Sequence, residues 1–145
     1  MKPPVSTIGY ERDTLDGVIA RLKAAGVETL VDVRAVASSR RPGFSKTLLG
    51  NSLRAEGIDY VHLRPLGTPK AGREAARAGR TDEMRAIFHA HLAEPAVQVA
   101  LGEAIALASA KRIALLCYEA EARCCHRAIV ADEIRARLKC EVVDL

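Results

Sequence analysis

Residues 112–119, which read RIALLCYE, are the stretch that decides the fold. The run is almost continuously apolar, which is typical of a central strand in a parallel sheet that is covered on both faces. Residues 124–139, CCHRAIVADEIRARLK, follow with apolar residues at helical spacing. A buried strand that leads into a helix is the repeating unit of α/β proteins.

The same alternation of strands and helices extends to both ends of the chain. We expect further strands at residues 5–10, 27–34, 58–67 and 140–145, and helices at 13–26, 81–94 and 95–109, with a shorter helix up to Gly57. Asp13 is the expected N-cap of the first helix. The sequence therefore predicts an α/β fold in a single domain, residues 1–145, whose mostly parallel sheet of about five strands has helices on both faces, as in Rossmann-like or flavodoxin-like proteins.

Composition and charge narrow the classes of function. The chain has 145 residues, enough for one domain with its own core, and 49% of them are apolar. Aromatic residues make up only 3% and Trp is absent, which argues against a surface that stacks the bases of single-stranded nucleic acid. The net charge is +4, and Lys and Arg are concentrated in residues 34–85, so an anionic partner is expected.

The sequence predicts neither a membrane segment nor disulfide bonds. The first residues, MKPPVSTIGYERD, lack the features of a signal peptide, and no stretch has the length of a membrane span, so a cytoplasmic protein with no membrane partner is expected. We interpret the four cysteines as free thiols, because two are adjacent and one ends an expected buried strand: Cys117, Cys124, Cys125 and Cys140.

Polar residues follow the ends of several expected strands. Parallel sheets bind ligands at the carboxyl ends of their strands, so these residues should face the same edge. They are Gly9, Tyr10 and Glu11 after the first strand, Asp32 and Arg34 on the second, Arg64 after His62 on the third, and Cys117 and Glu119 on the fourth.

Asp32 and Arg34 are two residues apart in a strand, so their side chains leave the same face. One interpretation is an arginine held by Asp32 and directed at an anionic ligand, because the planar guanidinium suits phosphate and carboxylate. The alternative is a structural ion pair. The position at the ligand-binding edge favours the first interpretation.

The loop SSRRPGF, residues 38–44, supplies two hydroxyl and two guanidinium groups immediately after that strand. Ser39 and Arg40 are therefore candidates for phosphate binding, and a solvated basic loop is the alternative. Residues 67–80, rich in Gly, Ala and basic side chains, indicate a surface loop or a weak helix, with a movable lid as one interpretation.

Glu119 lies just past the apolar run, where partial burial would raise its pKa and suit it to general acid or base catalysis. Neighbouring arginines would lower that pKa, so a positioning role or a salt bridge is the alternative. Residues 124–127, CCHR, lie at an expected helix start, where backbone donors, His126 and Arg127 could bind an anion. The alternative is a surface pair of Arg127 with Asp132 or Glu133.

Two sharper motifs are disfavoured. Cys117 and Arg123 fit the C-x5-R pattern of thiolate phosphatases, but the intervening YEAEA has no Gly and carries two carboxylates that would repel phosphate. Cys117, Cys124, Cys125 and His126 have the chemistry of zinc ligands, but separated Cys-x(2–4)-Cys or His pairs are missing and adjacent cysteines rarely bind one ion. No metal site is expected on these grounds.

The chain resembles the family known as domain of unknown function 488 (DUF488), and the resemblance covers nearly the whole length. The matching positions are Gly9, the Asp-x-Arg of Asp32 and Arg34, Ser39 and Arg40, Tyr60, the Leu-Gly of Leu66 and Gly67, the Cys-x-Glu of Cys117 and Glu119, and the Cys-His-Arg of residues 125–127. Relatives often carry a second Gly where this chain has Thr68. The resemblance implies an α/β fold with these residues gathered at one edge, and it brings no reaction.

The leading hypothesis is binding of an anionic, phosphate-bearing ligand, a nucleotide or nucleic acid, at that edge. The expected binding residues are Gly9, Tyr10, Arg34, Ser39, Arg40, Arg64, Cys117, Cys125, His126 and Arg127. Glu119, with Asp32, is the expected acid or base of a hydrolytic or transfer step. The sequence identifies no cofactor and leaves the oligomeric state open.

Two alternatives come from other functional classes. In the first, the chain is a non-catalytic nucleic-acid-binding module whose basic segment 64–85 contacts phosphates. In the second, it is a protein-interaction domain in which the charged residues form only a structural network.

Overall fold

Strand β4 (Ile113–Cys117) lies at the centre of a five-stranded parallel sheet with the order β3-β2-β4-β1-β5. The computed structural model describes residues 2–145. All five residues of β4 are buried, as its apolar sequence predicts. The other strands are β1 (Val5–Gly9), β2 (Thr29–Asp32), β3 (Asp59–His62) and β5 (Val142–Asp144). The predicted α/β class with an essentially parallel sheet is confirmed.

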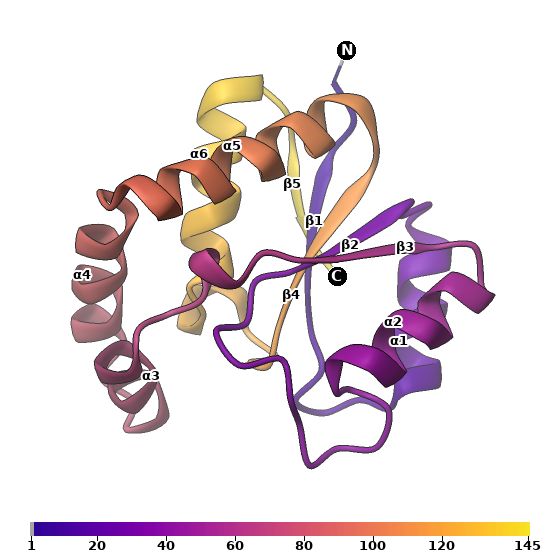
Figure 1. Cartoon of the computed structure of the whole chain (residues 1–145), viewed down its shortest axis with the longest axis horizontal. Coiled ribbons are helices and arrows are strands. Elements are labelled where there is room, and N and C mark those ends of the chain that lie inside the picture. Colours follow the sequence, from indigo (N-terminus) through magenta and orange to yellow (C-terminus); the bar gives the residue numbers. More distant parts are fainter. Residues whose placement is uncertain (1) are drawn as a thin grey trace.

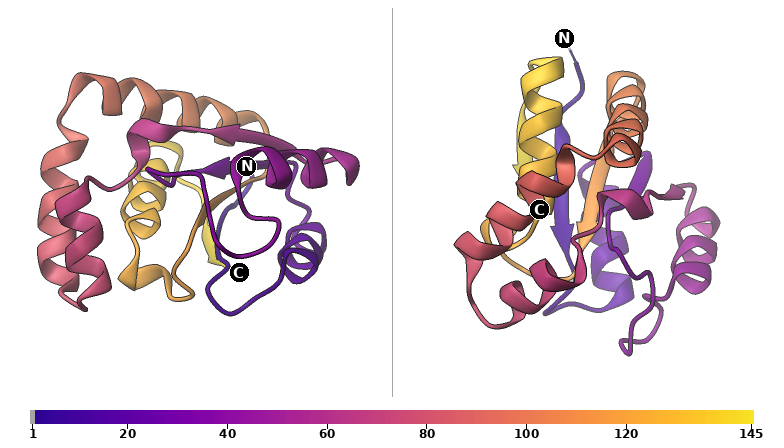
Figure 2. Two further views of the ribbon diagram at one scale, coloured as in Figure 1. Left: turned by 60° about the horizontal axis from the view of Figure 1, so that its bottom comes forward. Right: turned by 60° about the vertical axis from the view of Figure 1, so that its left-hand side comes forward.

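Helices cover both faces of the sheet (Figure 1). Helices α1 (Leu15–Ala24) and α2 (Lys46–Ala55) pack on one face, and α5 (Pro95–Ala110) and α6 (Arg127–Leu138) on the other. Helices α3 (Lys70–Arg77) and α4 (Thr81–Leu92) pack against each other beside the second layer, as the rotated views in Figure 2 show. Within residues 2–145, no single helix is long and apolar enough to cross a membrane; α4 and α5 reach that length and composition only when counted together, across a bend of 92°.

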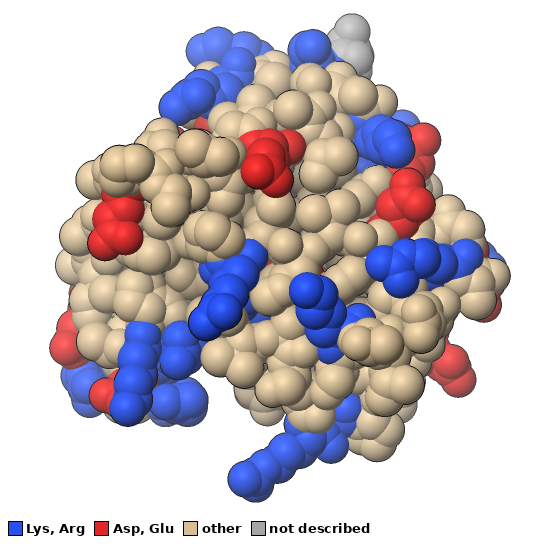
Figure 3. Space-filling view, viewed as in Figure 1, with Lys and Arg blue, Asp and Glu red and all other residues tan. Residues whose placement is uncertain are grey.

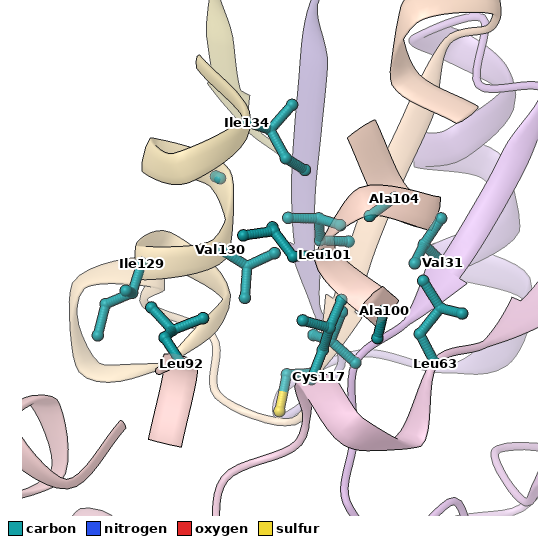
Figure 4. Packing of buried hydrophobic residues seen from close by; sticks show 14 of the residues in the cluster. Val31, Leu63, Leu92, Ala100, Leu101, Ala104, Cys117, Ile129, Val130 and Ile134 are labelled. Carbon is teal, nitrogen blue, oxygen red and sulfur yellow. The ribbon is translucent and has the colours of Figure 1, made fainter. Parts of the chain in front are cut away.

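Each face of the sheet has its own apolar core. The core on the α5 and α6 side includes Val31, Leu101 and Ile134, and the core on the α1 and α2 side includes Ile8, Leu30 and Leu53. Figure 4 shows the first core, with the sulfur of Cys117 pointing out of its end. The alternating side chains of the strands thus fill both layers, which fixes the register of the sheet and the direction of the residues at its edge.

The connection after β2 and the connection after β4 lead to opposite edges of the sheet. Strand β2 leads to β3 on one side, whereas β4 leads past β1 to β5 on the other. In open parallel sheets, ligands bind in the crevice at the carboxyl ends of the strands where the direction changes in this way. The segments after β2 and β4 therefore lie at the expected ligand site.

Local structure differs from the sequence-based expectation at the starts of α1 and α6. Thr14, and not Asp13, caps α1, because the Thr14 hydroxyl accepts a hydrogen bond from the Gly17 amide at 3.1 Å. Asp13 instead forms an ion pair with Arg21 at 2.8 Å. The last helix begins at Arg127, since residues 122–124 form a separate 3₁₀ turn.

The third strand and the segment after it also differ. Strand β3 ends at His62, and a 3₁₀ turn (Arg64–Leu66) follows it. Gly67 then approaches the backbone of Ala35 so closely that a Cβ atom there would lie 2.2 Å from the Ala35 Cα. This contact leads the chain into α3, which is a packed helix and not a surface loop, because its residues Gly72 and Ala75 are buried.

Candidate functional site

A cavity of about 420 Å³ lies at the carboxyl edge of the sheet, over the ends of β2 and β4. The loops after β1, β2 and β4 form one side, and α3 with the start of α4 forms the other. The lining residues are Tyr10, Arg34, Ala35, Val36, Ser38, Thr68, Arg73, Ala76, Arg77, Met84, Cys117, Tyr118, Glu119, Cys124, Cys125 and His126. The volume lies within the range of small-molecule sites, about 300–1,000 Å³.

Arg34 is held in this cavity by Asp32, whose side chain is fully buried. Arg34 Nε donates to Asp32 Oδ1 at 2.9 Å and Nη2 donates to Oδ2 at 2.7 Å. The Tyr60 hydroxyl donates to the same Oδ2 at 2.5 Å, and the Arg34 amide donates to Oδ1. Asp32 is therefore saturated by its neighbours and lies behind the cavity wall, a geometry that favours positioning of Arg34 over proton transfer.

The guanidinium group of Arg34 keeps its charge inside the protein. Burial alone would lower the pKa of Arg34, but the hydrogen bonds and charge of Asp32 raise it above its usual value. Burial and the hydrogen bond to Asp32 likewise raise the pKa of Tyr60, so its hydroxyl stays protonated. Arg34 Nη1 donates to the Tyr10 hydroxyl at 3.0 Å, and the Tyr10 ring stacks on Phe44 with centroids 4.3 Å apart.

Two histidines hold the backbone that carries Arg34. His62 Nε2 donates to the Arg34 carbonyl oxygen at 2.7 Å, and His126 Nε2 donates to the Val33 carbonyl oxygen at 2.7 Å. A carbonyl oxygen can only accept, so Nε2 carries the proton in both rings. Arg34 is thus fixed through both its side chain and its main chain.

Glu119 brings a carboxyl group to the same cavity. Its Oε2 atom is buried and has no hydrogen-bond partner within residues 2–145. Burial, followed by the negative charge of Cys125, raises the pKa of Glu119 to about 7. A buried polar atom without a partner is rare in native proteins and marks a place where a ligand, ion or water is expected to bind.

The third feature of the site is a cluster of two thiols and an imidazole. Cys117 ends β4, whereas Cys125 and His126 directly precede α6. His126 Nδ1 lies 3.9 Å from Cys117 Sγ and 3.7 Å from Cys125 Sγ, and all three side chains are buried. The three atoms lie within 4.8 Å of one another.

The three side chains of this cluster shift one another's pKa values in different directions. Burial alone would raise the pKa of Cys125, but its hydrogen bond with Cys117 and the charge of His126 lower it well below the ordinary thiol value. The interaction with Cys125, together with burial, raises the pKa of Cys117. Burial would lower the pKa of His126, but the charge of Cys125 raises it. Cys125 is therefore the more acidic thiol of the pair.

Close backbone contacts fix the loop between β4 and α6. A Cβ atom at Gly9 would lie 1.8 Å from the Glu119 carbonyl oxygen, so only glycine allows β1 to end against this loop. Arg127, which is 1% exposed, donates from Nη1 to the Glu119 carbonyl at 2.5 Å and from Nη2 to the Ala120 carbonyl at 3.2 Å. Glu11 accepts from the Ala120 amide. These contacts bring Cys117 and Cys125 together.

Helix α3 lines the opposite side of the cavity with positive charge. Arg73 and Arg77, one turn apart, both face it, and Arg73 also donates to the Thr68 carbonyl at 2.9 Å. Figure 3 shows Lys and Arg side chains gathered on the surface where α3 lies in Figure 1. The basic segment in the sequence thus becomes part of the wall of a cavity.

The residues expected from the sequence fall into three groups. Those that line the cavity are Tyr10, Arg34, Cys117, Glu119, Cys125 and His126. Those that lie behind its wall and hold it in place are Gly9, Asp32 and Arg127. Those that lie outside the lining are Ser39, Arg40 and Arg64, of which Arg40 and Arg64 are exposed and Ser39 bonds within its own loop.

Four lining residues were not singled out individually from the sequence, although they lie in the basic loop 38–44 and the basic segment 64–85: Ser38, Thr68, Arg73 and Arg77. The signal for the last two was the spacing of four residues between arginines, which places both on one face of a helix. Arg123, the second residue of the C-x5-R pattern, is exposed and pairs with Glu121, away from the lining.

The fold and this edge define an α/β protein with an arginine-lined cavity at the topological switch point of a parallel sheet. The chain matches the family described as domain of unknown function DUF488 over residues 14–134, and it belongs to that family. No curated protein and no solved structure matches the chain.

Proposed function

We propose that the chain binds a small phosphate-bearing ligand of nucleotide size in the cavity at the carboxyl edge. The observation that carries the proposal is the buried guanidinium of Arg34, oriented by Asp32 and facing the cavity. Three of its five N–H groups bind Asp32 and Tyr10, which leaves one N–H on each terminal nitrogen for a ligand. Two such donors suit a phosphate group.

Charge and size support the same ligand. Arg73 and Arg77 line the same cavity as Arg34, together with the hydroxyl groups of Ser38 and Thr68. A site that is enclosed on two sides and fits a small molecule favours a nucleotide over a polymer, which needs an open groove. The lining contains three arginines and two tyrosines, Tyr10 and Tyr118, so the arginines that suit phosphate carry the recognition.

The proposal assigns Glu119 to proton transfer in a hydrolytic or group-transfer step on that ligand. Its carboxyl group lines the cavity and has an unpaired oxygen. In hydrolysis, Glu119 takes the proton of the attacking water as the water oxygen bonds to the reacting centre, and the departing oxygen receives a proton in turn. Glu119→Gln should keep ligand binding and abolish product formation, measured by chromatography of the bound nucleotide.

The experiment is a thermal-shift panel at low and high salt with inorganic phosphate, mononucleotides, dinucleotides and short single- and double-stranded DNA and RNA. A ligand at 100 times its Kd stabilises the native state by about 2.7 kcal/mol. For a domain of this size, the Tm should rise by about 5–10 °C. We expect such a rise with a small nucleotide, and we expect it to persist at high salt.

Three variants sharpen the panel. Arg77→Ala removes an exposed cavity arginine and should reduce the shift, and Arg34→Lys keeps the charge beside Asp32 but loses the fork and should abolish it. Arg137→Ala, an exposed arginine on α6 outside the lining, is the matched control and should leave the shift unchanged. Equal shifts in all three variants would refute the proposal.

The same panel separates the alternatives. A shift that appears only with polymers at low salt and is unchanged in Arg34→Lys would indicate a nucleic-acid-binding module. No shift with any anion would indicate that Arg34 and Asp32 are a structural pair.

A further inference from the structure

We propose that Cys117, Cys125 and His126 bind one zinc ion through their two sulfur atoms and Nδ1. The site goes beyond the binding of an anion, because it uses different side chains and a different ligand chemistry. It also departs from the expectation of no metal based on the sequence. The adjacent pair Cys124 and Cys125 does not supply both thiols: the partner of Cys125 is Cys117, at the end of β4.

The distances from the two sulfur atoms to the imidazole nitrogen fit zinc. Zinc lies about 2.3 Å from thiolate sulfur and about 2.0–2.1 Å from imidazole nitrogen, so in a tetrahedral site the sulfur and nitrogen atoms are about 3.6 Å apart. The two separations between sulfur and Nδ1 here are 3.7 and 3.9 Å. Two sulfur ligands with one imidazole also favour zinc over the oxygen-preferring cations Mg²⁺ and Ca²⁺.

The surroundings orient His126 as a ligand. Because its Nε2 donates to the Val33 carbonyl oxygen at 2.7 Å, the neutral ring presents the lone pair of Nδ1 to both sulfur atoms. Histidine ligands of metals almost always donate from their other ring nitrogen to a carboxylate, a backbone carbonyl or water, as His126 does here. The ring also packs against Phe88, with centroids 5.1 Å apart, which restricts its rotation.

Burial argues against the main rival, a nucleophilic cysteine. Cys125 is 1% exposed, so an electrophile has little access to its sulfur, whereas a metal ion needs only the space between the three ligands. The three ligands leave a fourth coordination position. All three side chains belong to the cavity lining, and the unpaired Glu119 Oε2 lies in the same wall, so the carboxylate or a bound water is a candidate for that position.

The test is the metal content of the full chain after incubation with zinc and dialysis, together with the absorption spectrum after cobalt substitution. The wild type should hold one zinc per chain, and the cobalt form should show sulfur-to-cobalt charge transfer and the intense visible bands of a tetrahedral site. Cys117→Ser and His126→Gln should each weaken zinc binding by about 100-fold or more, since even partners of ligands contribute 10–100-fold.

Two cysteines outside the cluster provide matched controls. Cys124→Ser, next to Cys125, and Cys140→Ser, buried in the core away from the cavity, should retain one zinc per chain. Circular dichroism identifies any variant that fails to fold, and in that case the cobalt spectrum of the wild type decides. No zinc and no tetrahedral cobalt bands in the wild type, or equal zinc in Cys117→Ser, would overturn the proposal.

A disulfide between Cys117 and Cys125 that forms in the presence of zinc, detected by mass spectrometry, would also overturn it and indicate a redox pair. The outcome is independent of anion binding, because the only probes are zinc and cobalt. If the wild type binds zinc but its Tm does not rise with any nucleotide, only the proposal of nucleotide binding is refuted.

Discussion

Replacing Asp32 with Asn removes the negative charge that neutralises Arg34 while preserving the shape of the side chain. Arg34 is 5% exposed and Asp32 is fully buried, so the pair belongs to the buried class. Removing one partner of a buried ion pair costs about 3–5 kcal/mol, because the other charge stays buried without compensation. Arg34 faces the cavity, where water relieves part of that penalty, so we expect about 3 kcal/mol for Asp32→Asn.

The reverse change should cost more. Arg34→Met leaves the carboxylate of Asp32 with only the Tyr60 hydroxyl and the Arg34 amide as donors, away from the cavity. We expect about 4–5 kcal/mol. In the double variant neither charge remains, so its cost should be about 2–3 kcal/mol less than the sum of the two single costs.

The assay is urea unfolding of the wild type, both single variants and the double variant, followed by circular dichroism. Asp132→Asn, which breaks the exposed pair of Asp132 with Arg135, is the matched control and should cost less than about 1 kcal/mol. Additive costs for the two single variants would refute the reasoning, since they would show that Asp32 and Arg34 do not compensate each other.

Three further changes test separate parts of the structure. Gly9→Ala places a Cβ atom 1.8 Å from the Glu119 carbonyl oxygen and should lower the free energy of unfolding in urea by about 1–3 kcal/mol. The control is Gly102→Ala, whose Cβ atom meets nothing within 4 Å and which should be neutral or stabilising. Thr14→Ala removes the cap of α1 and should cost about 1 kcal/mol in the same assay. In metal-free protein, burial raises the pKa of Glu119 from 4.5 to about 7, so its stabilising contribution is complete below pH 4.5 and is lost as the pH rises through 7. Between pH 4.5 and pH 7 the Tm of Glu119→Gln should therefore fall less than the Tm of the wild type. Parallel curves of Tm against pH for the two proteins would contradict a buried Glu119.

The sheet could be predicted from the sequence because its signal is local. Apolar runs such as residues 113–117 and the helices between them are sufficient for the α/β class. The pairing of Asp32 with Arg34 was also predictable, because residues two apart in a strand leave the same face. The carboxyl-edge rule then placed Tyr10 and Glu119 at the same site without knowledge of the strand order.

Other features depend on contacts between distant segments. Helix α3 has a charged side and a side of glycine and alanine, but no large apolar side chain that would predict burial from the sequence, and it is ordered by burying Gly72 and Ala75. The spacing of the cysteines in the sequence likewise says nothing about how the loop after β4 folds back. Arg127 determines that fold by binding the carbonyl groups of Glu119 and Ala120, which brings Cys125 to Cys117.

The two proposed sites share one segment of backbone, which has a thermodynamic consequence. His126 donates to the Val33 carbonyl oxygen through Nε2 and would bind zinc through Nδ1. Arg34, which follows Val33 in the chain, would bind the anion. A metal that fixes the His126 ring also fixes Val33 and restricts the main chain of Arg34, so zinc should tighten anion binding. Linkage requires the anion to raise zinc affinity by the same factor. Calorimetric titration of phosphate with and without zinc, and of zinc with and without phosphate, measures both factors; two factors of one would show that the cluster and Arg34 act independently despite their shared backbone.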